Sequence, residues 1–330
     1  MDVLTGLNPA QKEAVEAIRG PVLILAGPGS GKTRVITHRI AYLVTVCGIS
    51  PRRIMAVTFT NKAASEMQER VRQLVGGSVD ELTMGTFHAI CARFLRRDGR
   101  SIGIDPHYVI YDADDQTRLV KRAMQELQID PAQYAPAALL GAISAAKSRL
   151  EGPAEYTHRD SYFDEIVVRV YERYQRLLEE SKALDFDDLL MRTVHLLHRD
   201  KRVLSRYQSR YLHVLVDEFQ DTNLVQYELI KLLAGRHRNI CVVGDPDQSI
   251  YSWRSADLRN ILSFEKDYPD ARVVLLEQNY RSTQTILEAA SHVISANQQR
   301  KPKGLWTENE AGALPEIVET YNEQEEAQYV

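Results

Sequence analysis

Lys32 and Thr33 close a glycine-rich stretch, AGPGSGKT, whose residue types suit the binding of phosphate groups. Gly29 and Gly31 let the backbone approach a phosphate closely, and successive N–H groups at the start of a helix supply positive potential. We expect Lys32 to reach the terminal phosphates of a nucleotide and the Thr33 hydroxyl to hold Mg²⁺. The expected phosphate cradle comprises Ala26, Gly27, Pro28, Gly29, Ser30, Gly31, Lys32 and Thr33.

The surroundings of this stretch separate a phosphate loop from an ordinary glycine-rich turn at the start of a helix. The apolar run PVLIL precedes it, and the apolar residues of TRVITHRIAYLV follow at helical spacing. Strand, loop and helix in that order are what a phosphate loop needs. One residue departs from the strict G-x-x-x-x-G-K-[ST] pattern, because Ala26 stands at the position of the first glycine.

Asp217 and Glu218 form a second chemical pattern, an acidic pair directly after the apolar run HVLV. In an ATP-hydrolysing site, Asp217 would bind Mg²⁺ and Glu218 would take the proton of the attacking water. On its own, Asp217 could equally cap the helix that follows. Together with the phosphate loop, the pair predicts an ATP hydrolase that uses ATP and Mg²⁺.

Six short apolar, β-branched runs carry these residues and define the expected sheet. Segments with helical periodicity separate most of them, and continuous apolar strands alternating with helices are typical of a parallel sheet buried on both faces. We therefore predict an α/β fold with the phosphate loop and the acidic pair at the same edge of a parallel sheet. The expected strands are residues 22–25, 54–59, 83–87, 213–216, 240–244 and 272–276.

The alternation of strands and helices breaks between residues 111 and 184. Apolar residues recur at helical spacing in QTRLVKRAMQEL and again in IVVRVYERYQRLL, which predicts two amphipathic helices. We interpret residues 111–184 as an all-helical insertion subdomain within the sheet domain. Later in the chain, EIVE at 316–319 is expected to form a strand before the start of an amphipathic stretch.

The composition of the 330-residue chain is that of an ordinary globular protein, with 44% hydrophobic and 26% charged residues. No apolar run approaches the ~18 residues of a membrane span. The three cysteines are scattered without a C-x-x-C pair, so we expect no membrane association and a cytoplasmic location. The net charge of −4 does not exclude nucleic acid, because a local groove can be basic on an acidic molecule.

Polar and aromatic segments follow several of the expected strands, at the same edge of the sheet as the phosphate loop. Phe59, Tyr251 and Trp253 lie there among hydroxyl, amide and basic residues. Aromatic platforms with cationic neighbours suit single-stranded nucleic acid, at about 1–3 kcal/mol per stacked base. Each aromatic residue taken singly could instead belong to the core. Trp253 beside Arg254, between polar residues, is an unusual core element and favours the nucleic-acid interpretation.

The order of these segments closely resembles the UvrD/Rep-type superfamily 1 DNA helicases, the group that includes PcrA. The resemblance extends from Leu7 to Ser282, and several long motifs in matching order make it specific. The motifs are LNPAQ, AGPGSGKT, TFTNKAA, GTFHA, VDEFQD, VGDPDQSIYSWR and QNYRS. The resemblance implies a first RecA-like ATPase domain at 1–110 and 185–280, the helical insertion at 111–184, and the start of a second RecA-like domain at 281–330.

The resemblance also implies roles for residues that the patterns alone do not assign. Gln11 would read the edge of the adenine, Tyr280 would stack on the adenine, and Arg34 would lie beside the nucleotide. Gln248 would sense the γ-phosphate and couple it to DNA, and Arg281 would stabilise the charge of the transition state. The residues implied along the path of a single DNA strand are Phe59, Thr60, Asn61, Lys62, Thr86, His88, Tyr251, Trp253 and Arg254.

By the same resemblance, the protein is expected to be an ATP-driven DNA helicase or translocase. It would move 3′ to 5′ on single-stranded DNA and act at junctions with duplex DNA during repair or replication. Two features depart from the family pattern: Ser255 replaces a usual glycine, and motifs of the second RecA-like domain are missing after QNYRS. In the family, the second RecA-like domain supplies a second arginine to the ATP site, and such an arginine finger raises the rate about 10³–10⁵-fold in related hydrolases. We therefore expect the 330 residues to be the amino-terminal portion of a helicase, with weak nucleotide binding, little hydrolysis and no unwinding.

Other interpretations of the sequence stay open at this point. The helicase subunit of an AddA/RecB-type helicase–nuclease shares the motor pattern, although the compact motif spacing favours the UvrD/Rep type. A truncated module could bind single strands without turning over ATP, but binding alone has no physical need for Lys32, Asp217 and Glu218 together. Gln11 could be an ordinary helix residue, and His88 a hydrogen-bonded core histidine.

Overall fold

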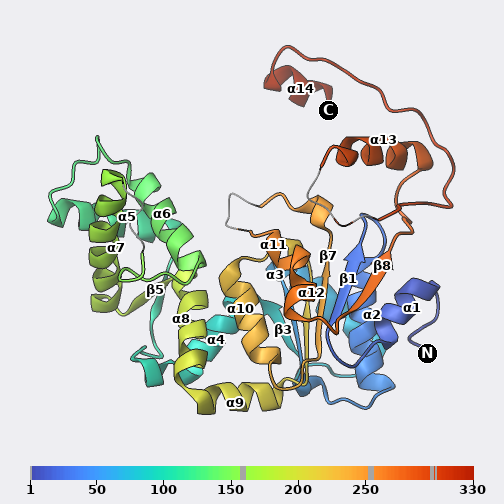
Figure 1. Cartoon of the computed structure of the whole chain (residues 1–330), viewed down its shortest axis with the longest axis horizontal. Helices are drawn as coiled ribbons and strands as arrows, with labels where there is room; N and C mark the ends of the chain where they lie inside the picture. The colour runs from blue at the N-terminus through green and yellow to red at the C-terminus, as the bar shows by residue number, and fades with distance from the viewer. Residues whose placement is uncertain (1, 157–160, 252–255, 298–300, 302) are drawn as a thin grey trace.

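The computed structural model describes residues 2–156, 161–251, 256–297, 301 and 303–330. Trp253, Arg254 and Ser255, which the sequence analysis singled out, lie outside the described residues. A central sheet with flanking helices carries a helical lobe on one side, and the carboxyl-terminal segment lies above the sheet in Figure 1. Among the described residues, no helix combines the length and the apolar character that crossing a membrane requires.

A six-stranded sheet, parallel throughout, forms the centre of the protein. Its strands are β1 (Val22–Ala26), β2 (Ile54–Thr58), β3 (Thr83–Thr86), β6 (His213–Val216), β7 (Ile240–Gly244) and β8 (Arg272–Leu276). They lie in the order β3-β2-β6-β7-β1-β8. All six strands predicted from the sequence are confirmed. Because the strands are parallel, their carboxyl ends and the loops that follow them lie at one edge of the sheet.

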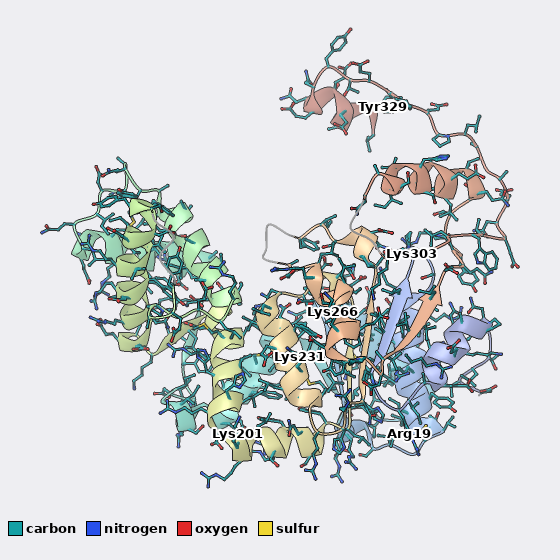
Figure 2. The ribbon with its side chains drawn as sticks, in the orientation of Figure 1. Arg19, Lys201, Lys231, Lys266, Lys303 and Tyr329 are labelled. Atoms are coloured by element: carbon teal, nitrogen blue, oxygen red, sulfur yellow. The ribbon has the colours of Figure 1, made fainter. Side chains whose placement is uncertain are left out.

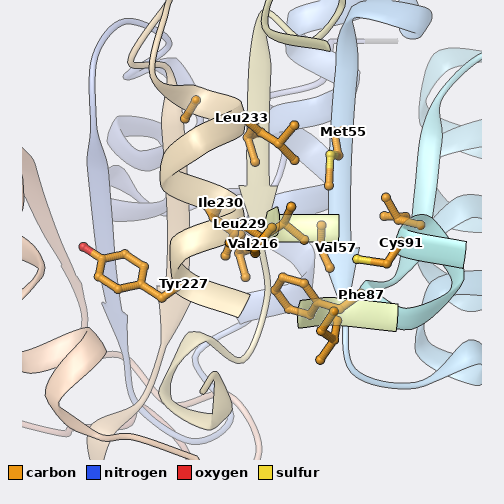
Figure 3. Packing of buried hydrophobic residues seen from close by; sticks show 14 of the residues in the cluster. Met55, Val57, Phe87, Cys91, Val216, Tyr227, Leu229, Ile230 and Leu233 are labelled. Atoms are coloured by element: carbon orange, nitrogen blue, oxygen red, sulfur yellow. The ribbon is translucent and has the colours of Figure 1, made fainter. Parts of the chain in front are cut away.

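Most strands are buried on both faces because their side chains alternate between two layers of helices, whereas the edge strand β8 is partly exposed. Leu23 and Leu25 of β1 belong to the core on one face, whereas Val22 and Ile24 belong to the core on the other. The first face is covered by α4 (Phe87–Asp98), α8 (Phe186–Arg199), α9 (Lys201–Arg210), α10 (Leu224–Ala234), α11 (Arg259–Leu262) and α12 (Phe264–Asp267). The second face is covered by α1 (Pro9–Glu16), α2 (Lys32–Thr45) and α3 (Asn61–Val75). Figure 3 shows part of the first core, where side chains of β2, β6, α4 and α10 pack together.

The helical lobe has a hydrophobic core of its own. Three helices form this core, to which they contribute Val120, Ile143 and Tyr171 among other residues. These helices are α5 (Ala113–Glu126), α6 (Pro136–Ser148) and α7 (Tyr162–Glu180), and the two amphipathic helices predicted from the sequence correspond to α5 and α7. A short parallel pair of strands, β4 (Val109–Tyr111) and β5 (Ala183–Asp185), bounds the lobe. The sequence analysis did not predict this pair, so the inserted block is helical in its core but not all-helical.

A cluster of buried charges links the lobe to α8. The Lys147 ammonium group lies 2.6 Å from Oδ2 of Asp185 and 3.0 Å from Oδ1 of Asp188. Tyr174 donates a hydrogen bond to Asp185 at 2.9 Å, and Gln175 donates one to Asp188 at 3.2 Å. Burial alone would lower the pKa of Lys147, but the facing carboxylates raise it above its usual value. A buried ion pair thus connects α6 to β5 and α8, and buried hydrogen bonds connect α7 to the same two carboxylates.

The strand predicted at residues 316–319 is wrong. These residues lie in no strand, and the Ile317 side chain is 99% exposed. A strand needs a neighbour that pairs with its backbone, and the described part of the chain pairs no strand with this segment. The carboxyl-terminal segment instead contains α13 (Gln284–Ser295) and α14 (Glu323–Tyr329), and α14 corresponds to the amphipathic stretch predicted after EIVE.

Candidate active site

The phosphate loop connects β1 to α2, as the sequence predicted. Gly29 and Gly31 have φ angles of 65° and 89°, which L residues with a side chain rarely adopt. A Cβ on Gly29 would lie 2.7 Å from Nδ2 of Asn279, so this position also lacks room for a side chain. The N-terminal N–H groups of α2, which begins at Lys32, suit an anion. Ala26 is the last residue of β1 and is fully buried, so its departure from the glycine pattern falls in the strand.

Lys32 meets the acidic pair at the carboxyl end of β6. Its Nζ lies 3.2 Å from Oε2 of Glu218. Glu218 has a φ of 48°, a left-handed conformation that costs a non-glycine residue about 1–3 kcal/mol and is concentrated at functional sites. Its backbone N–H donates to Oδ1 of Asp217 at 3.0 Å. The structure therefore brings the three predicted catalytic groups Lys32, Asp217 and Glu218 together.

Two glutamines connect this site to the turn after β7. Gln248 accepts a hydrogen bond from Lys32 at 3.2 Å and donates one to Oδ2 of Asp245 at 2.5 Å. Gln220 donates to Oε2 of Glu218 at 2.9 Å and accepts from the backbone N–H of Asp245 at 3.0 Å. Gln248 was predicted from the family pattern, and its contact with Lys32 places it at the phosphate loop. Asp245 and Gln220 were not predicted.

The residues around Asp217 fit a magnesium ion. Burial, together with the nearby Glu218 carboxylate, raises the pKa of Asp217 to about 7. Thr33 and Asp217 line one cavity of about 420 Å³, and a hydroxyl with a carboxylate is the type of oxygen donor set that Mg²⁺ prefers. A divalent cation would also stabilise the buried carboxylate. In the described ranges, no group of three or more His, Cys, Asp or Glu residues suited to a metal occurs, so the site near Asp217 would bind the ion with few protein ligands.

Gln11 and Tyr280 lie on either side of a small polar cluster beside the phosphate loop. The Gln11 amide donates to the Ser30 carbonyl at 2.9 Å and accepts from the Asn8 N–H at 3.1 Å. Asn8 also donates to the Tyr280 hydroxyl at 2.8 Å. The Tyr280 N–H donates to the Gly29 carbonyl at 3.0 Å. The structure brings both residues to the nucleotide end of the sheet, while their contact with adenine stays a prediction.

Three arginines border the phosphate loop or its cavity. Arg34 donates to the Gly6 carbonyl at 3.0 Å. The Cβ of Arg281 lies 2.8 Å from the position that a Cβ on Gly29 would take. Arg70 of α3 lines the same cavity as Asp217 and was missed by the sequence analysis. It is one of several charged residues on an amphipathic helix, and its spacing alone does not mark it.

A second cavity, of about 490 Å³, lies between the loops at the carboxyl edge of the sheet and helix α6 of the lobe. Five of the predicted DNA-path residues line it: Phe59, Thr60, Thr86, His88 and Tyr251. Burial lowers the pKa of His88, so its ring is neutral near pH 7 and offers hydrogen bonding and stacking rather than charge. The cavity therefore combines aromatic faces with hydroxyl groups.

The remaining predicted DNA-path residues are not brought into this cavity. Asn61 and Lys62 begin α3 and are exposed, and neither belongs to the cavity lining. Trp253 and Arg254 lie outside the described residues. The structure thus groups the residues that immediately follow β2 and β3, and it leaves the first turn of α3 at the surface.

A parallel sheet with this loop and acidic pair at its carboxyl edge is the architecture of RecA-like phosphate-loop nucleoside triphosphatases. The chain belongs to the UvrD/Rep helicase family. Residues 7–269 match the model of the UvrD/REP helicase N-terminal domain, and residues 274–330 match that of the UvrD-like helicase C-terminal domain. The family resemblance drawn from the motifs is confirmed.

Named relatives are bacterial helicases of this family. Over 329 residues the chain is 51% identical to the ATP-dependent DNA helicase PcrA of Staphylococcus aureus (strain Mu50 / ATCC 700699) and to that of Bacillus subtilis (strain 168). It is 49% identical to the protein of the same name from Staphylococcus epidermidis. These alignments cover 99% of this chain, but 45%, 44% and 45% of the respective relatives. The chain therefore spans less than half the length of the curated relatives it matches.

Proposed function

We propose that the chain is the ATP-binding portion of an ATP-dependent DNA helicase or translocase. The motor would move 3′ to 5′ on single-stranded DNA and act at single-strand/duplex junctions, in DNA repair or replication in the cytoplasm. The domain division at 1–110 with 185–280, 111–184 and 281–330 is part of this proposal. The names of the relatives support the helicase activity, while direction and pathway rest on the family resemblance.

The observation that carries the proposal is the contact between the two cavities. The cavity with the acidic pair and the cavity with the predicted DNA-path residues share part of their walls. The shared lining residues are Thr58, Phe59, Thr60, Asp221 and Tyr251. A movement of these loops on nucleotide binding would therefore change both cavities at once, which is what coupling of hydrolysis to movement along DNA requires.

The residues of the site divide the chemistry of hydrolysis among them. Lys32 and the N–H groups of the loop hold the phosphates, and Thr33 with Asp217 would hold Mg²⁺. The bound metal ion would neutralise charge that develops on the phosphate oxygens. Glu218 accepts the proton of the attacking water. Gln248 contacts Lys32 and lies in the turn that leads to Tyr251, so it connects the phosphate site to the second cavity.

ATP hydrolysis by the full-length protein that contains these residues, measured with and without single-stranded DNA, tests the proposal. We expect DNA to stimulate the steady-state rate, and Glu218→Gln to lower kcat by about 10²-fold or more because the general base is lost. Glu172→Gln, at an exposed position of α7, is the matched control and should leave the rate unchanged. A rate that does not respond to DNA would reduce the proposal to an ATPase without a DNA function.

A further inference from the structure

Lys303 contacts the turn after β7, beside the candidate ATP site, although no motif marks it. Its side chain is 2% exposed, and its ammonium group contacts Oδ1 of Asp245 and lies 3.2 Å from Oδ2 of Asp247. Burial, with the positive charge of Lys32, lowers the pKa of Lys303 to about 8. Figure 2 labels Lys303 near the upper end of the sheet. We call residues 303–307 the strap.

The strap is fixed to the chain that follows β8. The Trp306 N–H donates to the Glu277 carbonyl at 3.1 Å, and the Asn279 N–H donates to the Trp306 carbonyl at 2.8 Å. Leu305 packs against the phosphate loop so closely that a Cβ on Gly27 would overlap it. Backbone pairing and packing therefore set where the strap begins, and with it where the Lys303 ammonium group lies.

Asp245 connects Lys303 to the catalytic groups through two chains of hydrogen bonds. Through its carboxylate, it contacts Gln248, which contacts Lys32. Through its backbone N–H, it contacts Gln220, which contacts Glu218. Asp245 is fully buried, and a buried carboxylate that loses a cation partner is strongly destabilised. A shift of this residue would therefore reach both the phosphate-binding lysine and the general base.

We propose that Lys303 is a positioning residue for ATP hydrolysis, which fixes the turn after β7 so that Lys32 and Glu218 keep their places. The inference rests on the proposed ATPase function. The inference also gives the strap a role in coupling ATP hydrolysis to movement along DNA. A displacement of the strap relative to the sheet would withdraw the Lys303 ammonium group from Asp245. Lys303 itself acts through Asp245 and the glutamines, without taking part in bond breaking.

Lys303→Met, compared with Lys301→Met, both in the full-length protein, tests this role. Lys301 is the matched control because it lies two residues away and pairs with Glu265, away from the ATP site. We expect Lys303→Met to lower kcat for ATP about 10- to 100-fold, as loss of a supporting partner typically does, and to change KM by less than about threefold. Lys301→Met should change neither constant by more than about twofold. Lys303→Arg, which keeps the charge, should recover most of the rate.

A double-mutant cycle with Asp245→Asn separates positioning from a general loss of folding. If Lys303 acts through Asp245, the double variant should lose no more rate than Asp245→Asn alone. Additive losses, an unchanged kcat in Lys303→Met, or a gain in turnover would each overturn the inference. Far-ultraviolet circular dichroism of every variant identifies any that fails to fold. A full-length wild-type protein without ATP turnover would overturn the proposed function and this inference together. DNA-stimulated turnover that Lys303→Met leaves unchanged would overturn the inference alone.

Discussion

Lys147→Met tests whether buried charges hold the helical lobe against the sheet domain. Methionine fills a similar volume but removes the ammonium group that lies 2.6 Å from Asp185 and 3.0 Å from Asp188. Both carboxylates are buried, so the substitution leaves Asp185 without a cation and Asp188 with Arg192 alone, at 3.9 Å. Breaking a buried ion pair in this way costs about 3–5 kcal/mol, a large part of the 5–15 kcal/mol that stabilises a typical domain.

Urea unfolding followed by circular dichroism measures this cost. Lys182→Met is the matched control, because the Lys182 side chain is 73% exposed and lies 3.2 Å from Asp105, and such surface pairs contribute about 0–1 kcal/mol. Asp185→Asn added to Lys147→Met should recover stability, since it removes one of the unpaired charges. If Lys147→Met lowers the free energy of unfolding by less than about 1 kcal/mol, as the control does, the reasoning is refuted, because the ion pair then contributes no more than a solvent-exposed pair.

Three further predictions concern the phosphate loop and the two cavities. Gly29→Ala places a Cβ 2.7 Å from Asn279 in a left-handed backbone; the strain of about 1–2 kcal/mol should weaken binding of a fluorescent ADP analogue about tenfold. Gly77→Ala, with no atom within 4 Å of its Cβ, should have no effect, and equal affinities for both variants would contradict the prediction. Asp217 has a pKa near 7 and must ionise to bind Mg²⁺, so the affinity for Mg²⁺ should rise about tenfold from pH 6 to pH 8. A flat profile in a calorimetric titration would argue against Asp217 as a ligand. Tyr251→Ala should weaken binding of a single-stranded oligonucleotide by about 1–3 kcal/mol in fluorescence anisotropy, whereas Tyr329→Ala, at an exposed position of α14, should leave it unchanged.

The sequence predicted the sheet, and the placement of the glycine-rich loop and the acidic pair at its edge, because these features depend on local chemistry. Most strands are apolar runs, since they are buried on both faces, and polar residues with a defined chemical use follow the carboxyl ends of several of them. Gly29 and Gly31 were identifiable because a left-handed turn close to a ligand has few alternatives to glycine. The acidic pair was identifiable because carboxylates at the end of a buried strand need a reason to be there.

Other parts of the fold and of the site could not be predicted from the sequence because they depend on contacts between distant segments. β4 and β5 have only three residues each, which is too short for a periodic signal. Arg70 and Lys303 resemble surface residues in the sequence, and only the fold brings them to the cavity and to Asp245. EIVE has the composition of a strand, but strand formation depends on a pairing partner as much as on composition.

Asp245 lies where one loop of the parallel sheet can connect the proposed nucleotide site to the proposed DNA cavity. Asp245 follows β7, which lies between β6 and β1, so its neighbours on the two sides are the acidic pair and the phosphate loop. Its turn continues within the same loop to Tyr251, which lines both cavities. A loop that begins between the catalytic strands and ends in the second cavity must move with the nucleotide site if its base is rigid. The contacts of Asp245 with Gln220, Gln248 and Lys303 keep the base of this loop rigid. We therefore expect that a substitution which removes any one of these contacts reduces the coupling between ATP turnover and DNA before it reduces the affinity for either ligand.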